Sequence, residues 1–552
     1  MKIIKKIVLP IMIFSFLLIL FACNESAKYY NVEFIINDKI VFVEKVRENN
    51  YSEGFIAPEI ENYEFLYWQN KENNKEWLFN EYKVTKNITL VAIYEQKDTK
   101  HNKLTIFNLN DTHGAILNNP ANNELGLAKI ANYINKTRNN SIDNSIFIAN
   151  GDILQGQLIS NNNRGKVFIE IFNQLNLDAF ILGNHEFDWG IDVILNYFDK
   201  DAPGDVKANF PLLAANVINK NTGQRPTNIK SHTIVQKDNL NVGIIGVIGD
   251  GLESSISALR VKDYEFTNAF LAVKDIVTKI ENDVDIIVVA IHGDNNQFNE
   301  SVSKLPKVEA IINAHSHQEV IAKYNNKPVI QSGSNGKMIG QIDIFYETNN
   351  NNVNIKNYHS QNIKTHDYLN ESDLNVETII NKYYQEVKHL YEDEIITAKE
   401  NLSRSTLAKY ISKVMKTKAN AVAGFQNNGG TRANFYKGQK IKAADVLQVF
   451  PFDNQIIGVE LFGRELVIML NDSYFAKDTD IYVSEVNENN KYKIATNDYI
   501  FYYENNYYFE DYRNNNDFEI LGDMYETFLE VLMNLKANGY EYFDSQSPVI
   551  LN

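Results

Sequence analysis

Apolar and polar residues alternate in short runs near the amino-terminal end of the chain. The alternation covers residues 29–96, with apolar positions at Val32, Phe34 and Ile36 and again within 40–43, 65–67 and 88–92. A period of two is typical of strands that bury one face. The pattern therefore predicts a small β-rich module, and the charged stretch from Gln96 to Lys103 predicts a linker after it.

Beyond Leu104 the pattern changes to short apolar runs separated by amphipathic stretches, and it continues to about residue 347. The runs LTIFNL, SIFIAN, DAFILG and DIIVVAIHG suit buried strands, and residues 127–136 and 167–175 have helical periodicity. Alternating strands and helices predict an α/β fold with a layered sheet. A long helical pattern at 376–394 predicts a helix that connects this domain to a final α/β region, residues 395–552.

The first residues of the chain form a basic segment followed by an apolar run. Lys2, Lys5 and Lys6 precede the run at 7–21, and Cys23, the only cysteine, comes shortly after it. Such a run is typical of a secretory signal and is too short for a stable membrane span. We therefore expect residues 1–22 to be a signal peptide and the mature protein to be extracytoplasmic, without disulfides.

The charge of the chain restricts the class of partner. The 552 residues are enough for several domains, and the formal net charge is −16. Proteins that bind polynucleotides need a basic face, so the composition argues against a nucleic-acid polymer. A small phosphorylated ligand remains compatible, because bound cations and a few arginines can reverse the potential locally.

Polar residues of the metal-ligand type follow directly after the apolar runs. Five of the ten histidines fall in these places. Ends of strands in α/β sheets are where ligands bind, and Asp and His are the donors that a two-metal hydrolytic site uses. On an extended segment, Asp111 and His113 would point to one face and hold one ion, and His315 and His317 repeat the spacing. The candidates are Asp111, His113, Asp152, Asn184, His185, His292, His315 and His317.

The motifs NLNDTHG, GDILQG, GNHEFDWG, AIHGD and NAHSH resemble those of the calcineurin-like metallophosphatases, specifically the 5′-nucleotidase family. The resemblance implies a four-layer αββα sandwich over residues 104–347 and two divalent metal ions, with zinc, manganese, cobalt and iron all open. Ala314 stands where this family commonly has glycine. By resemblance one ion would be held by Asp111, His113, Asp152 and His317, and the other by Asp152, Asn184, His292 and His315.

The same resemblance assigns roles beyond the metal ligands. His185 would contact the phosphate or the leaving oxygen, and Asp188 would orient the His185 imidazole. The implied reaction is in-line attack of water on phosphorus.

Three later motifs, NNGGTR, VFPFDN and IATNDY, resemble the C-terminal substrate-binding domain of this family. The resemblance implies that Phe452 and Tyr499 sandwich a base and that the remaining contacts come from Asn427, Gly429, Arg432 and Asn454. Two departures affect specificity. Asn505 stands where the family has a ribose-binding aspartate, and SRSTLAKY, with Arg404 and Lys409, replaces another family pattern.

The amino-terminal region carries two further resemblances. The segment from Leu20 to Cys23 is similar to a bacterial lipobox, which implies lipidation of Cys23 and a membrane anchor. Residues 29–96, including VTKNITLVAIY, resemble the Listeria–Bacteroides (internalin B-type) repeat, a β-grasp-like surface module. This resemblance implies a cell-surface setting, and a surface partner of the module stays an open expectation.

Together these features predict a lipid-anchored, metal-dependent enzyme that hydrolyses nucleoside 5′-phosphates. The family resemblance also implies open and closed forms related by a rotation of the substrate domain. A 2′,3′-cyclic-nucleotide phosphodiesterase and a nucleotide-sugar or dinucleotide pyrophosphohydrolase stay open as alternatives, because the same metal site serves all three. A surface-binding lipoprotein with weak catalysis is the alternative from another class.

Overall fold

The computed structural model describes residues 28–551 apart from 56, 59, 61–62, 78, 80–81, 97–100, 139–141, 350–351, 365–370 and 504–505. The expected signal peptide, the lipidation site Cys23 and the expected ribose contact Asn505 lie outside the described residues. The chain forms two compact units, Met1–His101 and Asn102–Asn552.

The amino-terminal unit is a single mixed sheet. Its strands, in the order β2-β1-β5-β3-β4, are β1 (Tyr29–Ile36), β2 (Lys39–Arg47), β3 (Tyr63–Asn70), β4 (Lys75–Glu76) and β5 (Ile88–Gln96). Strands β1 and β5 run parallel in the middle. The alternation read from the sequence buries Val32 and Phe34, and the Phe34 ring meets Trp68 edge to face at 4.8 Å. This small sheet confirms the β-rich prediction.

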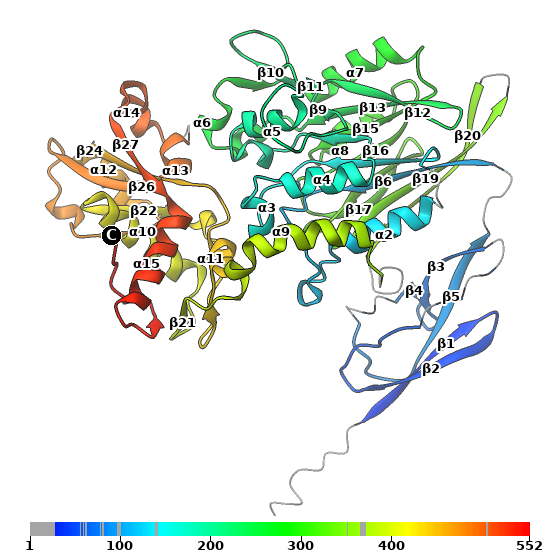
Figure 1. Ribbon diagram of the computed structural model, residues 1–552, viewed down its shortest axis with the longest axis horizontal. Coiled ribbons are helices and arrows are strands. Elements are labelled where there is room, and N and C mark those ends of the chain that lie inside the picture. Colours follow the sequence, from blue (N-terminus) through cyan, green and yellow to red (C-terminus); the bar gives the residue numbers. More distant parts are fainter. Residues whose placement is uncertain are drawn as a thin grey trace, which may run out of the picture. The chain divides into compact units, whose positions relative to one another are not determined.

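The second unit begins with two sheets that pack face to face (Figure 1). The seven-stranded sheet, in spatial order, contains β11 (Ile229–Lys230), β9 (Leu212–Leu213), β8 (Ala179–Ile181), β7 (Ser145–Asn150), β6 (Asn102–Leu109), β19 (Ile339–Asn349) and β20 (Asn352–Ile363). The six-stranded sheet contains β12 (His232–Lys237), β13 (Leu240–Ile248), β15 (Ile286–His292), β16 (Val308–Ile312), β18 (Lys327–Ser332) and β17 (Glu319–Tyr324). Ile106 and Ile148 from one sheet and Ile244 and Val288 from the other share the core between them.

Helices cover the outer faces of both sheets. The first sheet is covered by α2 (Leu127–Arg138), α4 (Lys166–Gln174), α5 (Ile191–Phe198) and α9 (Leu374–Glu392), and the second by α7 (Ala269–Ile280) and α8 (Asn296–Val302). Helix α9 starts at Asp373, whose side chain accepts hydrogen bonds from two backbone amides of the first turn. Its buried face carries Val376, Ile380 and Val387 at helical spacing. These layers confirm the αββα sandwich.

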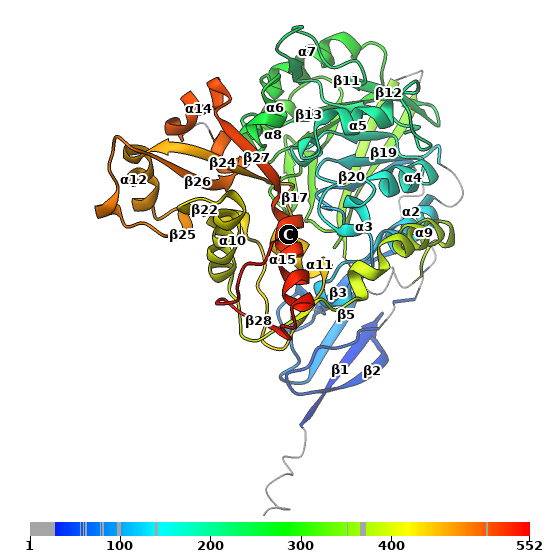
Figure 2. The same ribbon diagram turned by 60° about the vertical axis from the view of Figure 1, so that its left-hand side comes forward.

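The remaining residues form an α/β domain around a five-stranded sheet (Figure 2). In spatial order the strands are β25 (Phe475–Thr479), β22 (Ala423–Asn427), β26 (Lys491–Asn497), β24 (Gln455–Phe462) and β27 (Phe518–Asp523). The helices around it include α10 (Arg404–Ala419), α11 (Ala443–Val449), α12 (Gly463–Asn471), α13 (Asp498–Tyr502) and α15 (Met524–Ala537). A small sheet of β23 (Lys440–Ile441), β21 (Ile396–Ala398) and β28 (Tyr542–Phe543) completes the domain.

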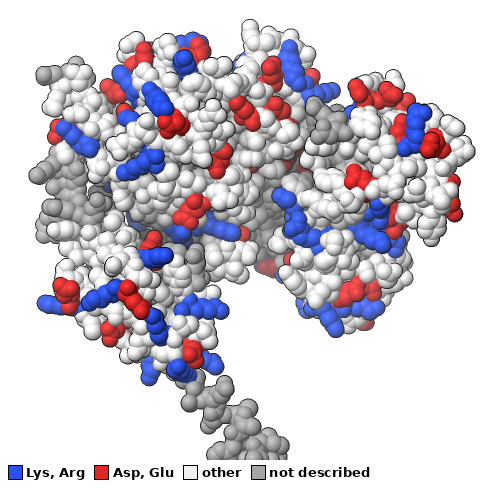
Figure 3. Space-filling view, turned by 180° about the vertical axis from the view of Figure 1, so that it is seen from behind, with Lys and Arg blue, Asp and Glu red and all other residues white. Residues whose placement is uncertain are grey.

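The surface carries charges of both signs. Figure 3 shows Asp and Glu side chains interspersed with Lys and Arg side chains over the face that it draws. Within the described part of the chain, none of the helices has the length and apolar character needed to cross a bilayer.

Candidate functional site

The strand ends of both sheets converge on one place. Asp111 and His113 follow β6, Asp152 follows β7, Asn184 follows β8, and His292 ends β15. His315 and His317 lie in the turn after β16. Because neighbouring parallel strands end at the same edge, residues far apart in sequence become neighbours there.

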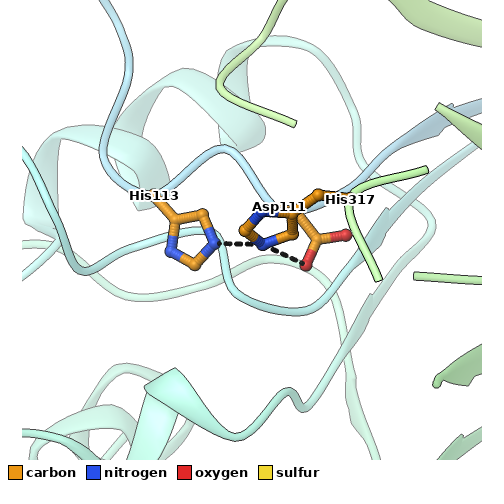
Figure 4. A group of neighbouring side chains, drawn as sticks. All are labelled: Asp111, His113 and His317. Atoms are coloured by element: carbon orange, nitrogen blue, oxygen red, sulfur yellow. Dashed lines mark hydrogen bonds and ion pairs between the residues drawn. The ribbon is translucent and has the colours of Figure 1, made fainter. Parts of the chain in front are cut away.

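Asp111, His113 and His317 form a first group of metal-ligand type (Figure 4). The Nε2 atoms of the two imidazoles lie 3.0 Å apart, and His317 Nε2 lies 3.7 Å from an Asp111 oxygen. Burial and the charge of His185 lower the pKa of His113 to about 3, so this ring is neutral and offers a lone pair. Burial also lowers the pKa of His317. The ligand atoms of the two imidazoles and of the Asp111 carboxyl group therefore lie close enough together to bind one cation.

Asp152, His292 and His315 form a second group, with the Asn184 amide beside it. His292 Nε2 lies 3.1 Å from Asp152 Oδ2 and 3.2 Å from Asn184 Oδ1, while His315 Nδ1 lies 3.0 Å from the same amide oxygen. The Asp152 carboxylate also contributes to a third group with His113 and His185. Asp152 therefore stands between the two clusters.

The donor set fits a cation of borderline hardness. Carboxylates, an amide oxygen and imidazole nitrogens converge without thiolates, the combination that zinc, manganese and iron accept in proteins. The 3.0 Å contact between His113 Nε2 and His317 Nε2 is a hydrogen bond when one ring carries its proton on Nε2, and it also brings both nitrogens within reach of one cation. The His and Asp clusters are thus consistent with a metal site.

The backbone at these positions is not extended. Asp111, His113, Asp152, His315 and His317 have φ between 47° and 74°, in the left-handed region. The expectation that Asp111 and His113, and likewise His315 and His317, project from one face of an extended segment was therefore wrong. Tight turns after the strand ends aim these side chains at the site, and Asp and His tolerate this conformation better than most residues.

His185 and Asp188 form the expected dyad. His185 Nδ1 lies 2.8 Å from Asp188 Oδ2, and the His185 backbone amide donates to Asp152 Oδ1 at 2.8 Å. Burial lowers the pKa of His185, but the charges of Asp188 and Asp152 outweigh it and raise this pKa to about 10. These charges favour the protonated imidazole, and the hydrogen bond to Asp188 fixes its orientation.

A cavity of about 540 Å³ connects this centre with the C-terminal domain. Phe452 lies over His185 with ring centroids 6.0 Å apart and an interplanar angle of 14°, and the Arg432 guanidinium lies 5.5 Å from the Phe452 ring centroid. The residues that line the cavity are Asp152, Asn184, His185, Asp188, Ser254, Ser255, Ser257, Arg260, His315, His317, Asn427, Gly429, Gly430, Arg432, Phe452, Asp453, Asn454, Tyr474, Asp498, Tyr499 and Tyr503.

Comparison with known families accounts for both parts of this site. Residues 104–319 match the family model of the calcineurin-like phosphoesterases, and residues 386–484 match that of the 5′-nucleotidase C-terminal domain. The two models together span the strand-end clusters and most of the far wall of the cavity. The chain belongs to the 5′-nucleotidase family. Its two matched regions are thus a calcineurin-like phosphoesterase domain and a 5′-nucleotidase C-terminal domain.

Individual relatives of this family are distant. Endonuclease YhcR of Bacillus subtilis is 24% identical over 415 residues, which cover 69% of this chain and 34% of the relative. The 5′-nucleotidase of Vibrio cholerae is 23% identical over 428 residues, 67% of this chain and 75% of the relative. The chain therefore spans about a third of the length of the first relative. A 5′-nucleotidase precursor structure from Thermus thermophilus aligns with a TM-score of 0.62 and 20% identity, over 79% of this chain and 97% of that one.

In this 5′-nucleotidase family member, six of the seven expected substrate contacts line the cavity. They are Asn427, Gly429, Arg432, Phe452, Asn454 and Tyr499. Asn505 lies outside the described residues, so its expected ribose contact stays a prediction. Arg404 is not among the lining residues, and its Nε donates to the Thr431 carbonyl at 2.8 Å.

Sequence reasoning missed one residue that shapes the candidate metal centre. Glu186 is 1% exposed, and its carboxylate accepts from the backbone amides of Asp152 (2.8 Å), Ile153 (2.9 Å) and Gly183 (2.9 Å). It therefore fixes the turn that carries Asp152. A glycine is needed at 183, since a Cβ there would lie 2.4 Å from Asp152 Oδ1. The only signal was an acidic residue inside GNHEFDWG.

The sequence also gave no indication of the cavity residues after β13. Ser254, Ser255, Ser257 and Arg260 lie in a short segment of η4 (Leu252–Ser255) and α6 (Ala258–Val261). This segment follows a strand end, so the strand-end rule could have drawn attention to it, but serines there carry no distinctive chemistry.

Proposed function

We propose that this chain hydrolyses nucleoside 5′-phosphates to nucleoside and phosphate, with two divalent metal ions. One observation carries the proposal. The aromatic ring expected to stack on a base, Phe452, lies 6.0 Å from the imidazole of His185, which belongs to the strand-end cluster. A ligand that stacks in this cavity can therefore place a phosphate at the candidate metal centre.

The ligands divide between the two ions as the family resemblance implies. The first set is Asp111, His113, Asp152 and His317, and the second is Asp152, Asn184, His292 and His315. Divalent ions held there supply positive charge that stabilises the phosphoryl oxygens and lowers the pKa of the attacking water. The protein contributes the rigid turns that fix the donors before the ions bind.

His185 acts on the substrate through its charge. The charges of Asp188 and Asp152 raise the pKa of His185, which favours a protonated ring that can donate from Nε2 to an anionic oxygen. Nδ1 is engaged with Asp188, which holds the ring in place. The cationic imidazole stabilises charge that develops on the phosphate or on the leaving oxygen.

The far wall of the cavity would bind the nucleoside. Phe452 and Tyr499 offer faces for stacking, which stabilises binding by roughly 1–3 kcal/mol per base and depends little on base identity. Arg432 lies near both Phe452 and His317, so its guanidinium can bind an anionic group of a ligand between them. Asn427 and Asn454 are the amide side chains available for base edges.

A substrate panel tests this function. We would follow substrate loss and product formation by chromatography for a nucleoside 5′-monophosphate, a 2′,3′-cyclic nucleotide, a dinucleotide and an aryl phosphate, each with added zinc, manganese or cobalt. Chromatography is needed because opening of the cyclic phosphate and cleavage of the dinucleotide pyrophosphate release no free phosphate. The highest kcat/KM is expected for the 5′-monophosphate. A higher value for the cyclic nucleotide or the dinucleotide would replace the proposed activity, and no turnover of any of the four would overturn it.

Two variants test the assigned roles. Asp152→Ala removes the carboxylate between the clusters and is expected to lower metal content and abolish turnover. His185→Ala is expected to keep the metal but to lose on the order of 10²–10⁴ in kcat, as loss of a general acid or electrostatic group typically does. Equal loss of metal in both variants would contradict the role given to His185.

We also infer that the mature enzyme is extracytoplasmic and anchored through lipidated Cys23. The support is the sequence alone: a basic segment, an apolar run that ends at Phe21, and a single cysteine two residues later, Cys23.

A further inference from the structure

A group of buried amides lies beneath the wall of the cavity that the C-terminal domain provides. Asn497 ends strand β26 and caps helix α13, where its Oδ1 accepts from the Ile500 backbone amide at 2.8 Å. Its Nδ2 donates to Gln426 Oε1 at 2.7 Å and to Asn427 Oδ1 at 2.9 Å. Asn497 and Gln426 are fully buried, and Asn427 is 6% exposed. Solvent therefore has little access to the contacts that Asn497 makes.

A backbone group fixes the direction of these hydrogen bonds. The main-chain N–H of Ile500 can only donate, so it requires the oxygen of Asn497 and leaves the Asn497 NH₂ facing the other two side chains. Gln426 and Asn427 must then present their oxygens to this NH₂. A rotated Asn427 would set one NH₂ group against another and lose a buried hydrogen bond, which is unfavourable.

The NH₂ of Asn427 is consequently left for a ligand. Asn427 lines the cavity, and among the described residues its Nδ2 has no hydrogen-bond partner. The Nδ2 lies toward Gly429, another lining residue, at 3.8 Å from the place that a Cβ would take there. The oxygen lies toward Gly430, where a Cβ would be 2.7 Å away. Asn427 therefore offers the cavity a donor and keeps its acceptor inside the protein.

Asn454, the other asparagine in the cavity lining, has the opposite orientation. Asp498 Oδ1 accepts from the Gln455 backbone amide at 3.2 Å and from Asn454 Nδ2 at 2.8 Å. The NH₂ of Asn454 is thus used within the protein, and its oxygen is the group left for the cavity. Because this orientation does not involve Asn497, a change at Asn497 acts on the donor alone.

We propose that Asn497 is a positioning residue that fixes Asn427 as a hydrogen-bond donor to the base. The inference rests on the proposed nucleotide hydrolysis. Asn497 is not among the lining residues and acts through Asn427. The acceptors of adenine are its ring nitrogens, so on this base the N–H of Asn427 pairs with one of them.

Adenosine 5′-monophosphate and its analogues with carbon in place of ring N1, N3 or N7 test the donor. In the wild type, one analogue is expected to lose roughly tenfold or more in kcat/KM relative to the parent nucleotide, mainly through KM, because it leaves the Asn427 N–H unpaired. In Asn497→Asp an acceptor replaces the NH₂, so Asn427 is expected to turn its own NH₂ toward residue 497 and its oxygen toward the cavity. The parent should then lose affinity while that analogue does not, and the ratio between them should fall below about threefold.

Three comparisons separate this role from a merely structural one. Asn497→Ser keeps an oxygen for the cap of α13 but removes the NH₂, so it should reduce the same ratio without adding a charge. Turnover of an aryl phosphate, which has no base, should stay close to the wild-type value in both variants. Asn515→Asp is the matched control, because it makes the same substitution at an exposed position of the same domain, outside the cavity lining.

Three outcomes would overturn the inference: equal kcat/KM for the parent and all three analogues in the wild type, an unchanged ratio in both Asn497 variants, or an equal loss of aryl phosphate turnover in them. A wild type that hydrolyses the aryl phosphate but no nucleotide would instead overturn the proposed function.

Discussion

Replacement of Glu186 by glutamine is expected to destabilise the turn that carries Asp152 in the candidate metal centre. The carboxylate accepts from Asp152 and Gly183 through one oxygen and from Ile153, with Leu154 at 3.4 Å, through the other. A glutamine can present its carbonyl oxygen to only one of these pairs, and its NH₂ then faces the other pair. Each buried N–H left without an acceptor costs about 1–3 kcal/mol, so the change costs about 2–6 kcal/mol.

Calorimetry without added metal would measure this cost. At about 2–4 °C per kcal/mol for a domain of this size, the phosphatase transition should fall by roughly 5–20 °C. Metal content after dialysis should also fall, because the Asp152 turn is no longer held. Glu124→Gln is the control, since Glu124 is 7% exposed but accepts only from side-chain amides at 3.4 and 3.5 Å. A shift below about 2 °C with unchanged metal content would refute the reasoning.

Three further changes probe other parts of the chain. Phe452→Ala is expected to raise KM for a nucleotide by roughly 5- to 100-fold through lost stacking, with little change for an aryl phosphate; equal effects on both would contradict the stacking role. Burial raises the pKa of Asp523 to about 7, above its value in the unfolded chain. The folded state therefore binds the Asp523 proton more tightly than the unfolded state does. This contribution to the free energy of unfolding is present at low pH and is lost as the pH rises through 7. Asp523→Asn keeps the side-chain oxygen that accepts from the Glu526 backbone amide but cannot ionise. Its Tm should therefore exceed that of the wild type by more at pH 8 than at pH 5, and an equal difference at both pH values would refute the role of Asp523 ionisation. Cys23→Ser is expected to move the protein out of the membrane fraction, and a wild type that takes up no labelled fatty acid would exclude the anchor.

The fold was largely predictable because its periodicity is strong. Runs such as IIVVAIH at β15 are buried on both faces, and the helices between them have one apolar face, so an αββα sandwich follows from the alternation and the family motifs. The ligand-type residues were found for a related reason, since each comes directly after an apolar run.

The remainder depends on contacts between segments that no local pattern links. Glu186 is read from sequence as an ordinary acid, and only the folded turn shows the backbone amides around it. Ser257 and Asp498 are 241 residues apart, and the Ser257 hydroxyl donates to the Asp498 carboxylate at 3.4 Å because the two domains are docked. The left-handed turn at His113 was missed as well, because a two-residue spacing alone suggests a strand.

The left-handed backbone at the five candidate ligand positions means that the side chains needed for the proposed function cost stability. A residue other than glycine in this region costs of order 1 kcal/mol or more, and Asp152 and His315 are among those that bear it. Replacing such a ligand by glycine would remove the donor but relax the backbone, whereas alanine would remove the donor and keep the strain. The most stable sequence for this fold is therefore not an active one. A descendant released from selection for catalysis could exchange its ligands for glycine and gain stability, so decay of the activity would leave a durable scaffold rather than an unfolded chain.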